Sequence, residues 1–290
     1  MRSQVSIIAK DVSGLCLTLL LALGCAVSAI GQKIAVLAPV QTPLATAYST
    51  RLSDAFATRF NVLDRDMADA AFRSVSIDDP FNLSIETSKI IGAVIGCDYF
   101  LLLRTGTLRR VSLNRPDYFE AFAAAYVVSA RTGRLVIWKL KNAEAETGNK
   151  AEARLVRSVD MLTNEISNEL PKIANAESTE TAPQSLERVP ADGTPAAKNF
   201  RAPVPYRRIA PESSTLAYLY GVTATVEIQV DLDADGKILR TEIVRWAGFG
   251  LDKAVDTAVR KMDWRPAERS GKTLPIRFLL RYNFKKIEKE

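Results

Sequence analysis

The sequence predicts an α+β protein with three parts: a mixed α/β sheet domain, a proline-rich linker and a small C-terminal α+β domain. Strand-like runs and helical stripes of apolar residues alternate over residues 33–173 and again over residues 203–290. Between them, residues 174–202 are rich in Pro, Ala, Ser, Thr and Glu, with few large apolar side chains. Such a composition buries too little surface to offset the entropy of ordering, so we expect a disordered linker there.

The bulk composition narrows the possible chemistry. A chain of 290 residues that is 47% hydrophobic and 25% charged suits two globular domains of ordinary size. It contains no histidine, which removes the commonest general base and metal ligand. The net charge of +6 comes without a dense block of Lys and Arg, so nucleic acid is not an expected partner. No nucleophile–base pair, metal cluster or phosphate loop stands out, and we expect a non-enzymatic protein without cofactor or metal.

The N-terminal segment, residues 1–29, has the features of a secretory signal peptide. Arg2 and Lys10 supply positive charge, and a mostly apolar run covers residues 15–26. This run is shorter than the ~20 residues that a membrane-spanning helix needs. We therefore expect export and a periplasmic location. Two alternatives stay open, namely lipidation at Cys25 and retention of the segment as a membrane anchor.

The first globular region starts with a short apolar run at residues 33–40 that predicts a buried strand. Helical spacing over residues 50–60 and 151–171 predicts two helices. Two long alternating segments surround Arg131–Arg134 and predict a hairpin with a glycine in its turn. Cys97 lies in an apolar stretch and is interpreted as a small buried hydrophobe, with a reactive thiol as the alternative.

Four short segments of this region carry a family pattern, namely Lys33–Leu37, Phe60–Arg65, Gly96–Tyr99 and Ala130–Arg134. In order and character they resemble the periplasmic domains of the CsgG and TolB N-terminal type. The resemblance implies a domain that serves assembly or binding in the cell envelope rather than catalysis.

The C-terminal region alternates apolar and polar residues over 222–230, turns at Asp235-Gly236 and resumes as a second strand over 238–246. An apolar stripe at helical spacing then marks one helix, and Pro266 ends it. The last strand, Ile276–Phe284, has one apolar face. Its other face consists of Arg277, Leu279, Arg281, Asn283 and Lys285.

A combination of motifs marks this region, namely Gly221–Val226, Val230–Ile238, Gly250–Asp252 and Met262–Ala267. Over residues 203–287 these motifs resemble the C-terminal domain of the TonB family of energy transducers. The resemblance implies a helix–hairpin–helix–strand domain. It also implies pairing with extended peptides of outer-membrane receptors or other envelope proteins by strand addition, and possible homodimers through the same domain.

The resemblance makes the last strand the candidate partner-binding site, with the five residues Arg277, Leu279, Arg281, Asn283 and Lys285. An ordinary edge strand blunted by charges is the alternative. The family's transducers couple through a histidine in a membrane helix, and this chain has no histidine. We therefore expect a periplasmic binding or adaptor protein, with a membrane-anchored transducer for receptor-driven transport as the alternative.

One acidic motif in this region suggests calcium. Asp231–Gly236 followed by Glu242 fits the consensus of an EF-hand loop, whose carboxylates would bind Ca²⁺. An EF-hand needs a helix on each side, and both flanks here alternate as strands do. A tight hairpin turn with Gly236 at positive φ is the preferred interpretation, with a calcium site as the alternative.

Overall fold

A computed structural model describes residues 31–285 except 112, 114–115 and 182–183. The predicted signal segment and its lipidation and anchoring alternatives fall outside the described residues. Within the described part of the chain, no helix is long and apolar enough to cross a membrane. The described residues from 32 onward form one unit, and its mixture of helices and sheets confirms the predicted α+β class.

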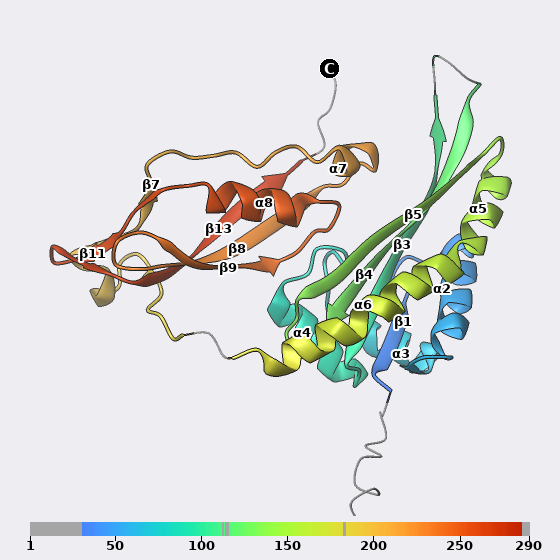
Figure 1. The fold of residues 1–290 in the computed structure, drawn as a ribbon, viewed down its shortest axis with the longest axis horizontal. Coiled ribbons are helices and arrows are strands. Elements are labelled where there is room, and N and C mark those ends of the chain that lie inside the picture. Colours follow the sequence, from blue (N-terminus) through green and yellow to red (C-terminus); the bar gives the residue numbers. More distant parts are fainter. Residues whose placement is uncertain (1–30, 112, 114–115, 182–183, 286–290) are drawn as a thin grey trace, which may run out of the picture. The chain divides into compact units, whose positions relative to one another are not determined.

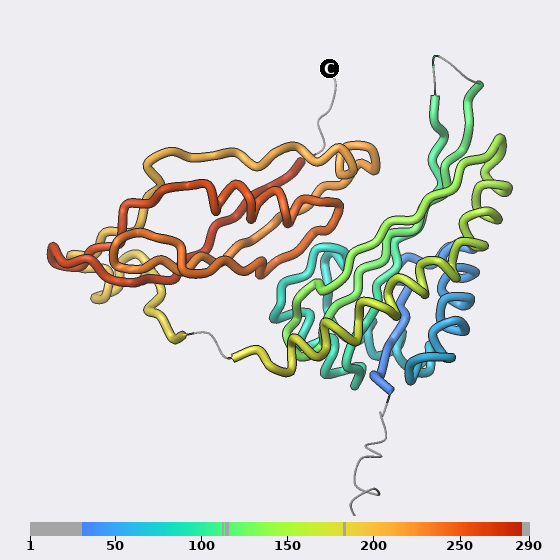
Figure 2. The backbone as a smooth tube through the Cα atoms, in the orientation of Figure 1, coloured from blue at the N-terminus to red at the C-terminus, as the bar shows by residue number. Residues whose placement is uncertain are grey.

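A five-stranded sheet organises the N-terminal region, in the order β2-β1-β3-β4-β5 (Figure 1, Figure 2). Strand β1 lies parallel to both β2 and β3, whereas β3, β4 and β5 form long antiparallel ladders. The sheet is therefore mixed, as strands that alternate with helices before a hairpin predict. The elements are β1 (Lys33–Leu37), α2 (Pro43–Phe56), β2 (Asn61–Val62), α3 (Arg65–Arg73), α4 (Ile85–Ile95), β3 (Tyr99–Arg110), β4 (Tyr118–Ser129), β5 (Leu135–Ala145), α5 (Gly148–Arg157) and α6 (Val159–Thr179).

Both faces of this sheet are covered. Helices α2, α5 and α6 lie along one face and bury Tyr48, Leu155 and Leu162 in a shared core (Figure 1). Helices α3 and α4 contribute to the core on the other face, together with Trp246 and Phe249 of the C-terminal region. Coverage on both sides explains the continuous run of small and apolar residues along β4, in which every residue from 120 to 129 is buried.

Side-chain caps fix where the helices of this region begin. Thr42, Asp64, Ser84 and Thr147 each accept a hydrogen bond from the backbone N–H three residues further on. These bonds satisfy N–H groups that have no partner within the helix. Helix α4 ends at Gly96, whose φ of 76° is the left-handed conformation common at helix ends.

The C-terminal region is built on a three-stranded antiparallel sheet in the order β13-β8-β9. Helix α8 contacts β8 and β9, and its buried Val255 shares a core with Val226 and Val230 of β8 (Figure 1). The order of helix, hairpin, helix and strand is the one that the TonB resemblance implies. The elements are η1 (Pro195–Ala197), β6 (Phe200–Arg201), β7 (Val204–Pro205), α7 (Thr215–Leu219), β8 (Ala224–Leu232), β9 (Ile238–Arg245), α8 (Leu251–Arg260), β10 (Trp264–Arg265), β11 (Ala267–Arg269), β12 (Lys272–Leu274) and β13 (Ile276–Phe284).

The segment expected to be a disordered linker, residues 174–202, differs from that expectation. Helix α6 continues through Thr179, and its residue Glu177 is buried. Further along, η1 forms, and β6 pairs with β11. Pairing with β11 and a bridge to Arg277 of β13 supply backbone partners to parts of this segment. The domain boundaries at 33–173 and 203–290 stay a prediction.

The acidic motif forms the turn of the β8–β9 hairpin. Asp233 Oδ1 accepts hydrogen bonds from the N–H groups of Asp235 and Lys237 at 2.9 and 2.8 Å. Gly236 has a φ of 84°. Glu242 lies on β9, where arginines pair with it. The hairpin interpretation is therefore confirmed, and the flanking helices of an EF-hand are not formed in this described segment.

We expect Gly236→Ala to lower the free energy of unfolding by about 1–3 kcal/mol. A Cβ at this position would lie 2.2 Å from the backbone oxygen of Trp264, and the positive φ strains any L side chain. Denaturant unfolding measures the loss. Gly271 has a similar φ of 78° and open space around it, so Gly271→Ala controls for the strain alone. Equal losses for both variants would contradict the close approach at Gly236.

Candidate docking edge

Strand β13 is an edge of the C-terminal sheet. It pairs with β8 on one side, and no other named strand of the described residues pairs with it. Residues at every second position share a face of a strand. One face of β13 thus carries the predicted residues Arg277, Leu279, Arg281 and Asn283, and Lys285 follows just beyond the end of the strand. These five residues are named the docking edge.

The two arginines of the docking edge are already paired with β8. Arg277 binds both carboxylate oxygens of Asp231 at 2.7 Å, and these side chains are only 13% and 6% exposed. Arg281 binds Glu227 at 2.6 Å. Charge-assisted pairs of this kind fix the side chains within the sheet. Arg277 is therefore not a free cation available to an acidic partner, whereas Arg281 is 63% exposed and shares Glu227 with Arg245.

Leu279 is the apolar side chain of the docking edge, and 52% of its surface is exposed. It lies between the two paired arginines in the sequence of the strand. Asn283 accepts a hydrogen bond from the hydroxyl of Thr225 at 2.9 Å, and Lys285 is exposed. A molecule that approaches this edge therefore meets an exposed apolar side chain beside the exposed side chains of Arg281 and Lys285.

The backbone of the docking edge points away from β8. The N–H of Arg277 donates to the carbonyl oxygen of Glu187 at 2.8 Å, and its carbonyl oxygen accepts from the N–H of Val189 at 3.1 Å. Because backbone direction alternates along a strand, the N–H and C=O groups of Leu279 and of every second residue after it also face outward. Among the described residues, the bridge between Arg188 and Arg277 is the backbone pairing found on this side of β13. Outward N–H and C=O groups are the ones that strand addition uses.

A groove of about 610 Å³ lies along the start of β13, which contributes residues 277–280 to its lining. Its apolar lining includes Val204, Trp264 and Phe278, and the rings of Trp264 and Phe278 meet edge-on with centroids 4.9 Å apart. Val189 also lines it. The groove therefore places apolar surface beside outward backbone groups. An extended segment can use both, because its alternate side chains point to opposite sides.

The other edge strand of this sheet, β9, is bridged at its end by the N-terminal region. Ser84 forms an antiparallel bridge with Arg245, and the N–H of Trp246 donates to the residue before Ser84 at 3.2 Å. The side-chain amide of Asn82 makes three hydrogen bonds, at 2.7, 2.8 and 2.9 Å, with the backbone of Trp246 and Thr225. These bonds satisfy buried backbone groups and fix this end of β9.

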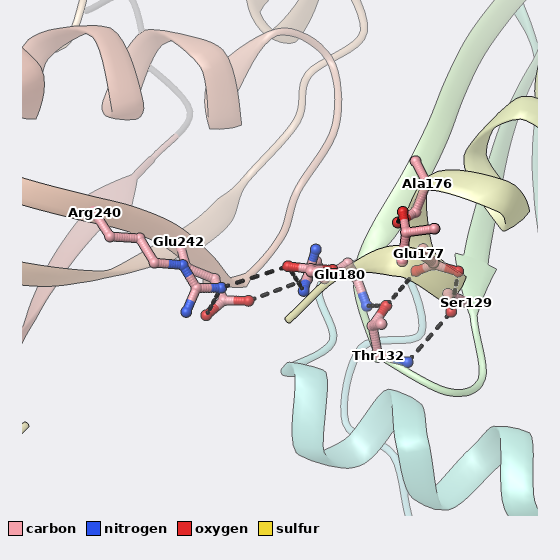
Figure 3. A network of polar contacts seen from close by, with 9 residues as sticks. Ser129, Thr132, Ala176, Glu177, Glu180, Arg240 and Glu242 are labelled. Atoms are coloured by element: carbon pink, nitrogen blue, oxygen red, sulfur yellow. Dashed lines mark hydrogen bonds and ion pairs between the residues drawn. The ribbon is translucent and has the colours of Figure 1, made fainter. Parts of the chain in front are cut away.

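A polar network joins the C-terminal end of α6 to β9 (Figure 3). Glu180 lies between Arg134 and Arg240, with N···O distances of 2.7 and 3.9 Å, and Glu242 pairs with both arginines at 3.1 Å. This network fixes where the chain leaves α6 on its way to the C-terminal region. Within α6, Glu177 accepts hydrogen bonds from the hydroxyls of Tyr99, Ser129 and Thr132.

The carboxylate of Asp252, in α8, holds the loop that follows Trp246. It accepts hydrogen bonds from the N–H groups of Ala247 and Gly248 at 2.9 and 2.8 Å. Burial raises the pKa of this carboxyl from 3.8 to about 6, although the two hydrogen bonds act to lower it. The folded state therefore holds the proton more tightly than the unfolded state. The resulting stabilisation is present below about pH 4 and is lost as the pH rises to about 6.

We expect the difference in the free energy of unfolding between the native chain and Asp252→Asn to depend on pH. The native chain should lose stability relative to the variant as the pH rises from about 4 to about 6, and the difference should then stay level. The reason is that only the native chain carries the carboxyl with the raised pKa. Denaturant unfolding across this range measures the difference. Asp235→Asn, on the exposed hairpin turn, is the control. A difference for Asp252→Asn that does not vary with pH would contradict the assignment.

Cys97, the cysteine of the predicted core, is buried among apolar side chains. Burial raises the pKa of its thiol to about 12. Because the thiolate is the reactive form, the thiol stays inert near neutral pH. The interpretation as a small buried hydrophobe is therefore favoured over a reactive thiol.

Comparison with known families and structures finds similarity in the C-terminal region. The family model described as Gram-negative bacterial TonB protein C-terminal matches residues 214–285. The solution structure of the Pseudomonas aeruginosa TonB C-terminal domain matches with 19% identity, 32% coverage of this chain, 91% coverage of that chain and a TM-score of 0.26. Residues 214–285 are a TonB C-terminal domain.

Two further solved structures match at lower identity. A lipoprotein from Neisseria meningitidis is 14% identical, with 47% of this chain and 99% of that chain covered and a TM-score of 0.33. The LpoB C-terminal domain from Salmonella enterica is 14% identical, with 42% and 89% covered and a TM-score of 0.27. Similarity at this level carries no argument about function. Comparison with curated proteins gave no match. The resemblance of residues 33–173 to CsgG and TolB N-terminal-type domains stays a prediction.

Proposed function

We propose that this chain is a non-enzymatic periplasmic binding or adaptor protein. Its TonB C-terminal domain takes an extended segment of an envelope or outer-membrane protein as an additional strand on the docking edge. The observation that carries the proposal is the outward backbone of β13 from Leu279 onward, with which no other strand of the described residues pairs. Main-chain hydrogen bonds provide the affinity, and the side chains of the groove provide the preference.

The surroundings of the docking edge support this class of partner. Arg277 is held in a buried pair with Asp231, and Leu279 and the groove supply apolar surface beside the outward backbone groups. At the opposite edge of the sheet, the bridge between Ser84 and Arg245 already occupies the end of β9. This favours β13 as the edge strand that pairs with a partner segment.

Photo-cross-linking in living cells tests the proposal with the full chain. A photoreactive amino acid replaces either Leu279, 52% exposed on β13, or Leu239, 55% exposed on β9 of the same sheet. Mass spectrometry then identifies the cross-linked segments. We expect position 279 to join one extended segment of an envelope protein, and position 239 to give no such product.

Equal yields from positions 279 and 239 contradict the proposal, as does the absence of any product from position 279. A product between two copies of this chain would assign β13 to homodimer pairing and would also contradict the adaptor role. The matched exposure of the two leucines ensures that a difference in yield reports the edge rather than accessibility.

A further inference from the structure

The first position of the docking edge is occupied by the chain itself. Residues 187–189 run parallel to the start of β13, with Arg188 opposite Arg277. The N–H of Arg277 donates to Glu187 at 2.8 Å, and its carbonyl oxygen accepts from Val189 at 3.1 Å. The segment therefore makes the same kind of main-chain contact that a bound partner strand makes.

Side chains direct this segment into the groove beside β13. The carboxylate of Glu187 pairs with the guanidinium of Arg269 on β11 at 2.5 and 3.0 Å. Arg277 donates a further bond to the carbonyl oxygen of Gln184 at 3.3 Å. Val189 is partly buried against the core and lines the groove. Occupation by this segment and by a partner would therefore exclude each other at this position.

The contacts that hold the segment are few compared with those of the strand it covers. Strand β13 pairs with β8 over nine residues, whereas the segment makes a single bridge. No residue from 184 to 190 is fully buried. The side chains of Glu187 and Arg269 are 41% and 36% exposed, and ion pairs that open to water contribute little to stability. The segment can therefore leave while β13 stays in the sheet.

We infer that residues 184–189 are a displaceable intrachain strand that competes with partners for the first position of the docking edge. The identity of the partner that replaces the segment rests on the proposed function. The contact between the segment and β13 does not. Tethering gives the segment an effective concentration on the order of millimolar beside β13. A partner that pairs from Leu279 onward therefore extends to Arg277 only by displacing this segment.

A synthetic peptide that copies residues 184–192 provides a probe that does not depend on the unknown partner. It is titrated into the native chain and into a chain whose residues 184–189 are replaced by glycine and serine at the same length. Amide chemical shifts of Arg277 and Leu279 report binding, and the remaining β8 and β13 shifts report the fold. We expect the replaced chain to bind the peptide at least 10-fold more tightly than the native chain.

A disulfide provides a second route that keeps the segment in place. Arg188→Cys with Arg277→Cys, in a chain with Cys16→Ser and Cys25→Ser, joins positions on neighbouring strands, and Asp231→Asn in the same chain removes the carboxylate that would lose its partner Arg277. Strands lie about 4.8 Å apart, within the separation that a disulfide spans. We expect the oxidised form of this variant not to bind the peptide. Reduction of the disulfide in the same variant should restore peptide binding.

Two results would overturn the inference. One is a folded replaced chain that binds the peptide no better than the native chain. The other is binding at β13 that is the same in the oxidised and reduced chains. Neither depends on an envelope partner, because the probe is the chain's own segment. Failure of the proposed function appears separately, as the absence of a cross-linked envelope segment at position 279 in both the native and the replaced chain.

Discussion

Replacing Trp246 by alanine is expected to lower the free energy of unfolding by about 3–5 kcal/mol. The side chain is 1% exposed and packs against Tyr126 of β4, with ring centroids 5.6 Å apart. It belongs to the core that the C-terminal region shares with the five-stranded sheet. Its removal leaves a cavity at this shared core and loses the transfer free energy of the largest buried side chain.

Denaturant unfolding followed by circular dichroism measures the effect of Trp246→Ala. Leu239→Ala, on the exposed side of β9, is the control and should change the free energy of unfolding by less than about 0.5 kcal/mol. A loss below about 1 kcal/mol for Trp246→Ala would show that the two regions do not share a core. Two separate unfolding transitions in the variant, with a single one in the native chain, would show directly that this side chain couples the regions.

Replacing Leu279 by proline is expected to weaken binding of the partner segment by at least about 10-fold. Proline removes the outward N–H at the centre of the docking edge, and its ring obstructs an incoming strand. The pairing of β13 with β8 should persist, because the N–H that is lost faces away from β8. The measurement is fluorescence anisotropy of a labelled synthetic peptide that copies the cross-linked segment.

The matched control for this prediction is Leu279→Ala, which removes the side chain but keeps the N–H group. We expect its effect on affinity to be several-fold smaller than that of Leu279→Pro. Equal losses for the two variants would assign the affinity to the leucine side chain and count against strand addition. Unchanged binding by Leu279→Pro would exclude position 279 from the interface.

Much of the C-terminal fold could be predicted because it depends on local periodicity. Alternation over 222–230 and the glycine of the turn predict the β8–β9 hairpin, and the apolar stripe predicts α8. The partners of the docking-edge arginines depend on register instead. Pairing of Arg277 with Asp231 follows only once β13 is known to run antiparallel to β8. Two acidic residues four positions apart on β8, facing two arginines four positions apart on β13, were the available signal.

The features around the site could not be predicted because they join residues far apart in the sequence. The composition of residues 174–202 predicts disorder because the segment has little apolar surface of its own. Its order comes from Arg269 and Arg277, which lie more than 80 positions further on. The contact at the end of β9 likewise depends on Asn82. Its side-chain amide donates a hydrogen bond to the backbone oxygen of Trp246, and nothing in the local sequence indicates this role.

Amide hydrogen exchange along β13 tests strand addition most directly. The full chain is compared free and bound to the synthetic peptide that copies the cross-linked segment. Strand addition predicts that the N–H groups of Leu279, Arg281 and Asn283 become protected on binding, while those of the intervening residues, already bonded to β8, do not change. Protection confined to β9, or no alternation along β13, would contradict docking at this edge.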